Sequence, residues 1–164
     1  PQRSAGLRKR VNSAPPPLEF LAQVRCEVGA LVNLGAGPYG ERRCVPLLGG
    51  SVSGPGLNGA ILPGGVDWQI LRADGALDIQ AHYIVRTIDG ALIEIDSRGL
   101  RHGPPAVMQR LARGEAVAPG DYFFRTLMRF QTGHADWLHL NATMALARGE
   151  RQAQHVVLDV FRIG

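Results

Sequence analysis

The chain has 164 residues, 45% of them hydrophobic and 20% charged, which is the length and composition of one globular domain. Its 21 glycines and 11 prolines are too many for a helical bundle and favour short strands joined by turns. The net charge of +4 comes from residues 1–17, which hold no acid. Because the rest of the chain is formally neutral, we expect no nucleic-acid partner.

We interpret residues 1–17 as a disordered, basic leader rich in proline, because they contain Pro15-Pro16-Pro17 and show no hydrophobic periodicity. The folded domain is then expected over residues 18–164. No apolar segment is long enough to span a membrane, and no apolar stretch follows the basic N-terminus. We therefore expect no membrane partner and a cytoplasmic protein.

Two residue types limit the chemistry. In a chain with a sizeable core, Cys26 and Cys44 are expected to be free thiols rather than a disulfide. Lys9 is the only lysine, and it lies in the leader. Schiff-base chemistry, a pyridoxal phosphate site and a GxxxxGK[ST] phosphate loop all need a lysine at a packed site, so the sequence argues against each of them.

Hydrophobic alternation predicts strands along most of the chain. Leu18–Val28 places apolar residues on one face and charge mostly on the other, which is typical of a half-buried strand. Residues 44–62 form short apolar pieces separated by glycines. Two Asp-Gly turns then join a predicted meander of three strands over Trp68–Arg72, Leu77–Thr87 and Leu92–Asp96.

The C-terminal half adds one helix and three strands. Prolines open a short helix over residues 104–114, and Gly114 ends it. Strands are predicted over 122–131, 154–163 and also 137–147, where apolar residues alternate although the composition suits a helix. The fold class is mainly β: a single closed antiparallel β-barrel of about eight or nine strands with one short helix, since closure removes exposed strand edges.

The sequence carries no clear signal for a cofactor or a metal. Residues 35–40 fit GxGxxG, but Pro46 follows too soon for the long helix that a dinucleotide site needs. The five histidines lack zinc-site spacing, and no GxSxG motif is present. We expect no cofactor and no metal. Nucleophilic hydrolysis is unsupported rather than excluded, because catalytic triads assemble across a fold.

The segment Pro63-Gly64-Gly65-Val66-Asp67-Trp68 is more unusual. Its two glycines let the backbone bend or approach another group closely, and they deliver a carboxylate and an indole at the start of a strand. In the alternative interpretation, Asp67 caps its own turn and Trp68 fills the core. These residues alone leave both interpretations open.

Many short motifs occur in one order between Leu18 and Ile163. They are Gly49-Gly50, Gly54-Pro55, Pro63 to Trp68, Asp74-Gly75, Leu77-Asp78, Tyr83, Asp89-Gly90-Ala91, Gly99, Phe124-Arg125-Thr126, Phe130, Thr132-Gly133 and Leu140-Asn141. With these motifs the chain resembles the bacterial domain of unknown function 3237, also called uncharacterised protein family 0311. The resemblance implies an antiparallel β-barrel similar in architecture to allene oxide cyclase and dirigent proteins, and it implies no established activity.

Two motifs depart from the family pattern. The family's YxWLN segment is here Trp137-Leu138-His139-Leu140-Asn141, with a histidine in place of a tryptophan. The usual proline and glutamate of FRTxPxFE are Met128 and Gln131. His139 adds a group that titrates near neutrality, and the loss of the glutamate removes a candidate base.

A barrel of this size can enclose one small ligand. We predict catalytic roles for Asp67, Arg125 and His139, and ligand-binding roles for Trp68, Tyr83 and Asn141. Asp67 or His139 would move a proton, and Arg125 with Tyr83 would stabilise negative charge on oxygen. Trp68 would stack on the substrate. Asp67 and Arg125 are expected within ion-pair reach of each other or of one shared ligand.

Two functions stay open. The first is a barrel that binds a small molecule and acts as a cofactor-independent cyclase or isomerase on a small, largely apolar substrate. The alternative is a non-catalytic structural or oligomerisation module, so the sequence does not decide whether the protein is an enzyme. The sequence also leaves open which face of residues 137–147 points inward, and a homo-oligomer with an interface outside the barrel would bury both faces.

Overall fold

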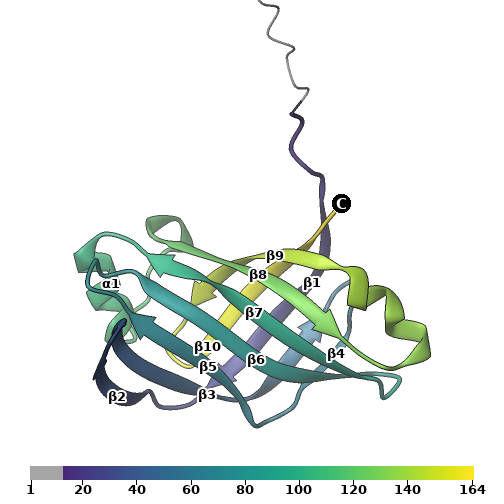
Figure 1. The fold of residues 1–164 in the computed structure, drawn as a ribbon, viewed down its shortest axis with the longest axis horizontal. Coiled ribbons are helices and arrows are strands. Elements are labelled where there is room, and N and C mark those ends of the chain that lie inside the picture. The colour runs from purple at the N-terminus through teal and green to yellow at the C-terminus, as the bar shows by residue number, and fades with distance from the viewer. Residues whose placement is uncertain (1–12) are drawn as a thin grey trace, which may run out of the picture.

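The computed structural model describes residues 13–164, most of which form strands of one antiparallel sheet (Figure 1). The strands are β1 (Leu18–Val28), β2 (Val32–Gly37), β3 (Gly40–Ser53), β4 (Gly59–Ile61), β5 (Gly65–Leu71), β6 (Leu77–Thr87), β7 (Leu92–His102), β8 (Phe123–Gln131), β9 (Met144–Arg151) and β10 (His155–Ile163). The helices are α1 (Pro105–Ala112) and two 3₁₀ segments, η1 (Pro119–Asp121) and η2 (Ala135–Ala142). None of the helices within residues 13–164 is long and apolar enough to cross a membrane.

The leader predicted over residues 1–17 is described only in part. Residues 1–12 lie outside the described residues. Residues 13–17 are exposed and belong to no helix or strand, and the Pro17 carbonyl accepts a hydrogen bond of 2.9 Å from the Gly164 amide. The chain therefore joins the barrel at β1, beside the end of β10.

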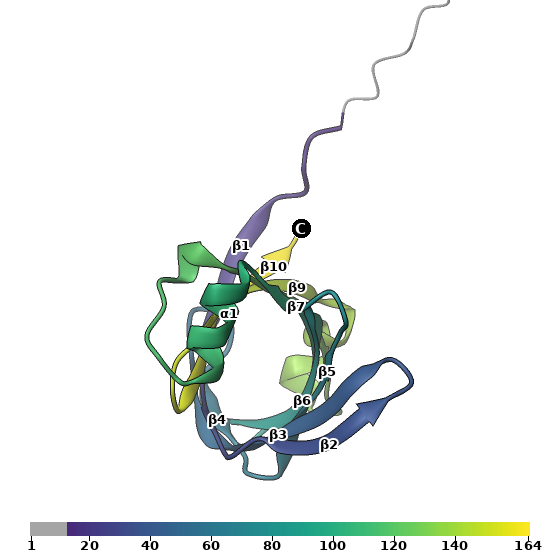
Figure 2. The ribbon, with the colours of Figure 1, turned by 90° about the vertical axis from the view of Figure 1, so that its left-hand side faces the viewer.

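The sheet closes on itself into a barrel with eight strand positions (Figure 2). From β1 the ring passes through β10, β9, β8, β7 and β6. The next position is shared by β4 and β5, because both pair with β6 on one side and β3 on the other. The pairing of β3 with β1 completes the ring. The predicted closed antiparallel barrel is confirmed, and its ten strands exceed the predicted number because one position holds two short strands and β2 pairs with β3 beyond the ring.

Alternation of inward and outward residues fills the barrel, as a closed sheet requires. On β8, Phe124, Thr126, Met128 and Phe130 are buried, whereas the residues between them are more exposed. The first two glycines of the GxGxxG match, Gly35 and Gly37, lie in β2 and the third, Gly40, begins β3, so the motif forms a hairpin. No helix follows it, as the early Pro46 predicts.

The two ends of the barrel are different. The helix α1 lies at the left-hand end in Figure 1, while η2 lies at the right-hand end and is seen through the ring in Figure 2. At the η2 end, Leu140 is 1% exposed and Trp137 packs against the core. Side chains of η2 therefore pack against the core at this end of the barrel.

The strand predicted over residues 137–147 is wrong in its first half. η2 takes up Ala135–Ala142, and β9 begins only at Met144. A 3₁₀ helix has three residues per turn, so Trp137 and Leu140 fall on the same side and pack against the barrel while Leu138 stays half exposed. The leucines at every second position suggest a strand, whereas in the 3₁₀ helix every third residue faces the core.

Candidate functional site

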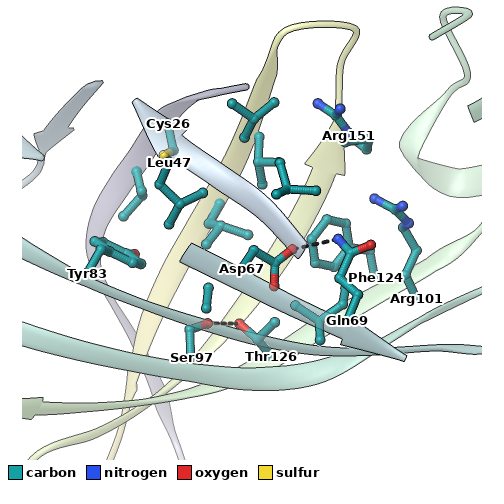
Figure 3. Close-up of a pocket in the computed structure, with 17 residues that line it drawn as sticks. Cys26, Leu47, Asp67, Gln69, Tyr83, Ser97, Arg101, Phe124, Thr126 and Arg151 are labelled. Carbon is teal, nitrogen blue, oxygen red and sulfur yellow. Dashed lines mark hydrogen bonds between the residues drawn. The ribbon is translucent and has the colours of Figure 1, made fainter. Parts of the chain in front are cut away.

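A cavity lies inside the barrel, among side chains of β1, β3, β5, β6, β7, β8, β9 and β10 (Figure 3). Its volume is about 50 Å³. Most of the lining is apolar, and the polar lining groups are Asp67, Gln69, Tyr83, Ser97, Arg101, Thr126 and Arg151. An apolar chamber with a few convergent polar groups is the usual form of a small-molecule site.

Asp67 reaches the cavity because β5 alternates. Gly65 begins this strand next to Tyr83, where a Cβ would lie only 2.6 Å from the Tyr83 Cβ, so the backbone approach requires glycine. Two residues later Asp67 points inward, and Gln69 follows on the same face. The alternation of inward and outward residues along β5 thus accounts for a carboxylate inside an apolar chamber.

Of the two oxygens of the Asp67 carboxylate, one accepts a side-chain hydrogen bond and the other has no partner. The Gln69 Nε2 donates a hydrogen bond of 2.7 Å to Asp67 Oδ2, and the Arg43 Nε donates one of 3.0 Å to Gln69 Oε1, which fixes the orientation of the amide. Asp67 Oδ1 is buried and has no hydrogen-bond partner. Burial raises the pKa of Asp67 to about 6, although the bond from Gln69 and the charges of Arg101 and Arg151 favour the ionised form.

Arg101 and Arg151 lie on the side of the cavity nearest Gln69 (Figure 3). Arg101 is 9% exposed, its Nε has no partner, and its guanidinium lies 5.6 Å from the centre of the Phe124 ring. Burial, together with the nearby charge of Arg151, lowers the pKa of Arg101 to about 10. Arg151 is anchored by hydrogen bonds from Nη1 to the carbonyls of Gln152 and His155.

The opposite side of the cavity holds Tyr83 and Cys26 (Figure 3). The Tyr83 hydroxyl is buried without a partner, and burial raises its pKa, so the phenol stays neutral and can donate a hydrogen bond. Burial also raises the pKa of the Cys26 thiol to about 11, which makes it a poor nucleophile. Between the two sides, the Ser97 Oγ donates to the Thr126 Oγ1 at 2.9 Å.

A second, larger hollow of about 480 Å³ adjoins the cavity, and we call it the mouth. It is lined by residues of α1 and by Leu31, Arg43, Leu71, Leu77 and the loop at Asp74-Gly75. It shares Val45, Gln69, Arg101 and Arg151 with the inner cavity. A ligand would therefore pass the two arginines on its way from the mouth to Tyr83.

The structure brings together only two of the six predicted site residues, Asp67 and Tyr83. Trp68 and Arg125 lie on the outer surface, since each follows or precedes an inward residue on its strand. Trp68 is stacked under the Arg42 guanidinium at 4.9 Å, and the Arg125 guanidinium lies 5.3 Å from the Phe123 ring. The expected approach of Arg125 to Asp67 is therefore wrong, and Arg101 and Arg151 hold that place.

His139 and Asn141 lie on η2, at the end of the barrel away from α1, and both are exposed. The ring of His139 stacks on Trp137 at 5.9 Å. Asn141 instead holds the chain after β8: its Oδ1 accepts from the Thr132 amide at 2.8 Å, and its Nδ2 donates to the Thr132 carbonyl at 2.9 Å. Neither residue lines the inner cavity.

Strand parity carries a signal for the residues that were missed. Ile93, Ile95 and Ser97 face inward on β7, and two more steps of two lead to Arg101. On β9, Ala145 and Ala147 lead in the same way to Arg151. Extending each apolar face beyond its last apolar residue would have placed both arginines inside the barrel.

A possible metal-ligand group lies outside this site, at the η2 end. Asp89, His134 and Asp136 place their ligand atoms within 4.8 Å of one another. Asp89 already accepts hydrogen bonds from Thr87 and from the Trp137 indole, and the His134 Nδ1 accepts from the Asp136 amide. The group is mostly exposed, and its hydrogen bonds account for its arrangement.

Comparison with known proteins places the chain in a family. The family described as "Protein of unknown function (DUF3237)" matches residues 16–163. A UPF0311 protein of Rhodopseudomonas palustris is 36% identical over 150 residues, which cover 90% of this chain and 98% of that protein. The hydroalkoxylation enzyme phnH of Penicillium herquei is 33% identical over 79 residues, which cover 48% of this chain and 52% of that enzyme.

A solved structure agrees with these matches. The crystal structure of a conserved protein of unknown function from Rhodopseudomonas palustris superimposes with a TM-score of 0.87 at 33% identity, covering 93% of this chain and 99% of that one. The similarity in sequence and in fold extends over nearly the whole barrel. The chain therefore belongs to the DUF3237, or UPF0311, family of β-barrel proteins.

Proposed function

We propose that this protein binds a small, largely apolar molecule inside its barrel and catalyses a cofactor-independent cyclisation or isomerisation by proton transfer. The observation that carries the proposal is Asp67, whose buried Oδ1 has no partner and faces an apolar cavity. A general base works best when its pKa lies near the operating pH, and the pKa of Asp67 is raised to about 6. A merely structural carboxylate would be expected to have its hydrogen bonds satisfied.

Three side chains would take part in the proposed reaction. Asp67 Oδ1 would accept a proton from the substrate and return it at another position. The neutral Tyr83 hydroxyl and the Arg101 Nε, both buried without hydrogen-bond partners, would stabilise negative charge that develops on a substrate oxygen. The apolar lining would exclude water and so strengthen both effects.

A hydroalkoxylation has this form, and one relative is named for that reaction. In its intramolecular version, an O–H bond and the π bond of an alkene are broken while a C–O and a C–H bond are formed, so substrate and product have the same composition. Asp67 would take the hydroxyl proton as the oxygen attacks the alkene, and the proton would return to the neighbouring carbon. No oxidant, reductant or metal is needed to balance this step.

The test is turnover of a panel of unsaturated phenols and alcohols, with and without a carboxylate, of which 2-allylphenol is the simplest. Its cyclisation to 2-methyl-2,3-dihydrobenzofuran is followed by chromatography at constant mass. We expect turnover of at least one member of the panel, and Asp67→Asn to reduce the rate by at least about 100-fold. Below pH 6 the rate should fall, because Asp67 gains a proton.

The matched control is Asp78→Asn, which makes the same chemical change on the neighbouring strand β6 at a position paired with Ile70, away from the cavity lining. It should leave the rate unchanged. Absence of turnover across the panel, or equal rates for the wild type and Asp67→Asn, would contradict the proposal and favour a non-catalytic barrel.

A further inference from the structure

Within the described residues, Arg101 is a buried cation with no counterion in contact with it. Within residues 13–164, no carboxylate oxygen lies within 4.0 Å of its guanidinium, and its side chain makes no hydrogen bond. The guanidinium lies over the face of the Phe124 ring. Burying an unpaired charge destabilises a protein by several kcal/mol, so such a group is expected where a ligand supplies the missing charge.

The charges around Arg101 leave room for one negative charge. We call Arg43, Arg101 and Arg151 the arginine collar, since Arg43 lines the mouth and the other two line both the mouth and the inner cavity. Glu41 lies 3.9 Å from Arg43 and balances it, and Asp67 is the acid that lines the inner cavity. Asp74, which lines the mouth, is paired with Arg72 and adds no net charge. The remaining balance is one positive charge, held by Arg101 and Arg151 together.

The collar also separates two environments. On its inner side the cavity is lined mainly by apolar side chains and ends at Tyr83, and on its outer side the mouth is open beneath α1. We propose that the site selects organic monocarboxylates, with the carboxylate on Arg101 and Arg151 at the collar and the apolar body divided between the inner cavity and the larger mouth. This inference rests on the proposed function, because it names a chemical group of the molecule bound at the same site.

A carboxylate fits the collar better than a phosphate. Guanidinium groups bind planar carboxylates through paired N–H donors, and the free edge of Arg101 includes the unpartnered Nε. A phosphate monoester carries nearly two charges at neutral pH, which exceeds the one-charge balance of the site. Asp67 beside the collar would repel the second charge.

The experiment measures binding by calorimetry with saturated, unreactive probes in matched pairs. The pairs are hexanoate with hexanamide and 3-phenylpropionate with 3-phenylpropanamide, and 2-phenylethyl phosphate is the third type of headgroup. We expect the wild-type protein to bind at least one acid about tenfold or more tightly than its amide. This comparison needs no variant, so it does not depend on how well a mutant folds.

Arg101→Gln should remove the preference for the acid while leaving the affinity for the amide unchanged. The matched control is Arg98→Gln, an exposed arginine of the same strand that pairs with Asp96 outside the cavity, and it should retain the preference. Equal binding of acid and amide, tighter binding of the phosphate, or no binding of either acid would overturn the inference.

Asp67→Asn separates this inference from the proposed function. It removes a negative charge next to the collar, so it should bind the acids at least as tightly as the wild type while losing turnover. If turnover fails for every panel member but the acids still bind in preference to the amides, only the proposed reaction is wrong. If neutral substrates turn over and the acids show no preference, only the carboxylate inference is wrong.

Discussion

At the scale of single residues, we expect the ionised, buried carboxylate of Asp67 to lower the free energy of unfolding. Its pKa is about 6 in the folded protein and near 3.8 when unperturbed, so between these pH values the native state holds a proton that the unfolded chain has lost. The free energy of unfolding therefore rises as the pH falls through this window, and the penalty is complete above about pH 6. Asp67→Asn should stabilise the protein by up to about 3 kcal/mol at pH 7.5 and have little effect near pH 4.

Urea denaturation of both proteins at the two pH values measures this difference. Asp78→Asn on the outer side of β6 controls for the loss of a charge, and it should not show the same dependence on pH. If the Asp67→Asn variant is less stable than the wild type at pH 7.5, the carboxylate stabilises the fold and is a structural group. The motif at residues 63–68 left both possibilities open, and this measurement decides between them.

Of the polar residues that line the cavity, the sequence predicts some and misses others. Asp67 and Tyr83 were found because a glycine pair and an apolar strand face mark them. Arg101 and Arg151 were missed because a charged residue at the end of an apolar face is ordinarily solvated. Only the neighbouring strands make those two positions internal, and that information is tertiary.

At the scale of secondary-structure elements, Asn141 ties η2 to the strand that precedes it. Asn141 makes two hydrogen bonds to the backbone of Thr132, which joins η2 to the end of β8. Asn141→Ala should lower the stability by about 1–3 kcal/mol, because both backbone groups lose their partner. The affinity of the inner cavity for its ligand should stay the same, since Asn141 lies at the other end of the barrel.

His139→Ala is the natural comparison for that variant. His139 is exposed on the same helix, and its closest aromatic partner is Trp137. Thermal unfolding should show a change within about 0.5 kcal/mol for His139→Ala, as for most surface substitutions. A drop in ligand binding for either variant would restore these two residues to the site that the sequence predicted.

The same element explains the main error in the predicted fold. Residues 137–147 alternate in polarity, and they also have a helix-friendly composition. Propensity was correct for Ala135–Ala142, and alternation was correct from Met144 onwards. The boundary depends on the bonds from Asn141 to Thr132 across nine positions in the chain, which no local window can include.

At the scale of the whole molecule, closure of the barrel was predictable, while the sharing of one ring position by two strands was not. The turns at Asp74-Gly75 and Asp89-Gly90 and the alternating faces between them already define a meander, and a meander of this length is most stable when its edges meet. β4 and β5 line up only because Leu62 to Gly64 interrupt one strand while β3 and β6 continue on either side.

Closure of the barrel also requires the backbones of neighbouring strands to approach closely, and a substitution at Gly99 tests this requirement between β7 and β8. A Cβ at this position would lie 1.9 Å from the Arg125 carbonyl oxygen and 2.7 Å from the Thr126 Cα, so β7 and β8 could not keep their present spacing. Gly99→Ala should lower the stability by about 1–3 kcal/mol or more. Because Gly99 precedes Arg101 by two residues on β7, the acid-over-amide preference should weaken as well.

Gly133→Ala supplies the control, because a Cβ there meets no atom within 4 Å and the backbone has no positive φ. It should be neutral or slightly stabilising, since alanine reduces the freedom of the unfolded chain. The two variants are compared by thermal unfolding, where 1 kcal/mol corresponds to a shift in Tm of about 2–4 °C for a domain of this size. If both variants unfold at the wild-type temperature, β7 and β8 can separate without loss, and the ring does not depend on the glycine at their closest approach.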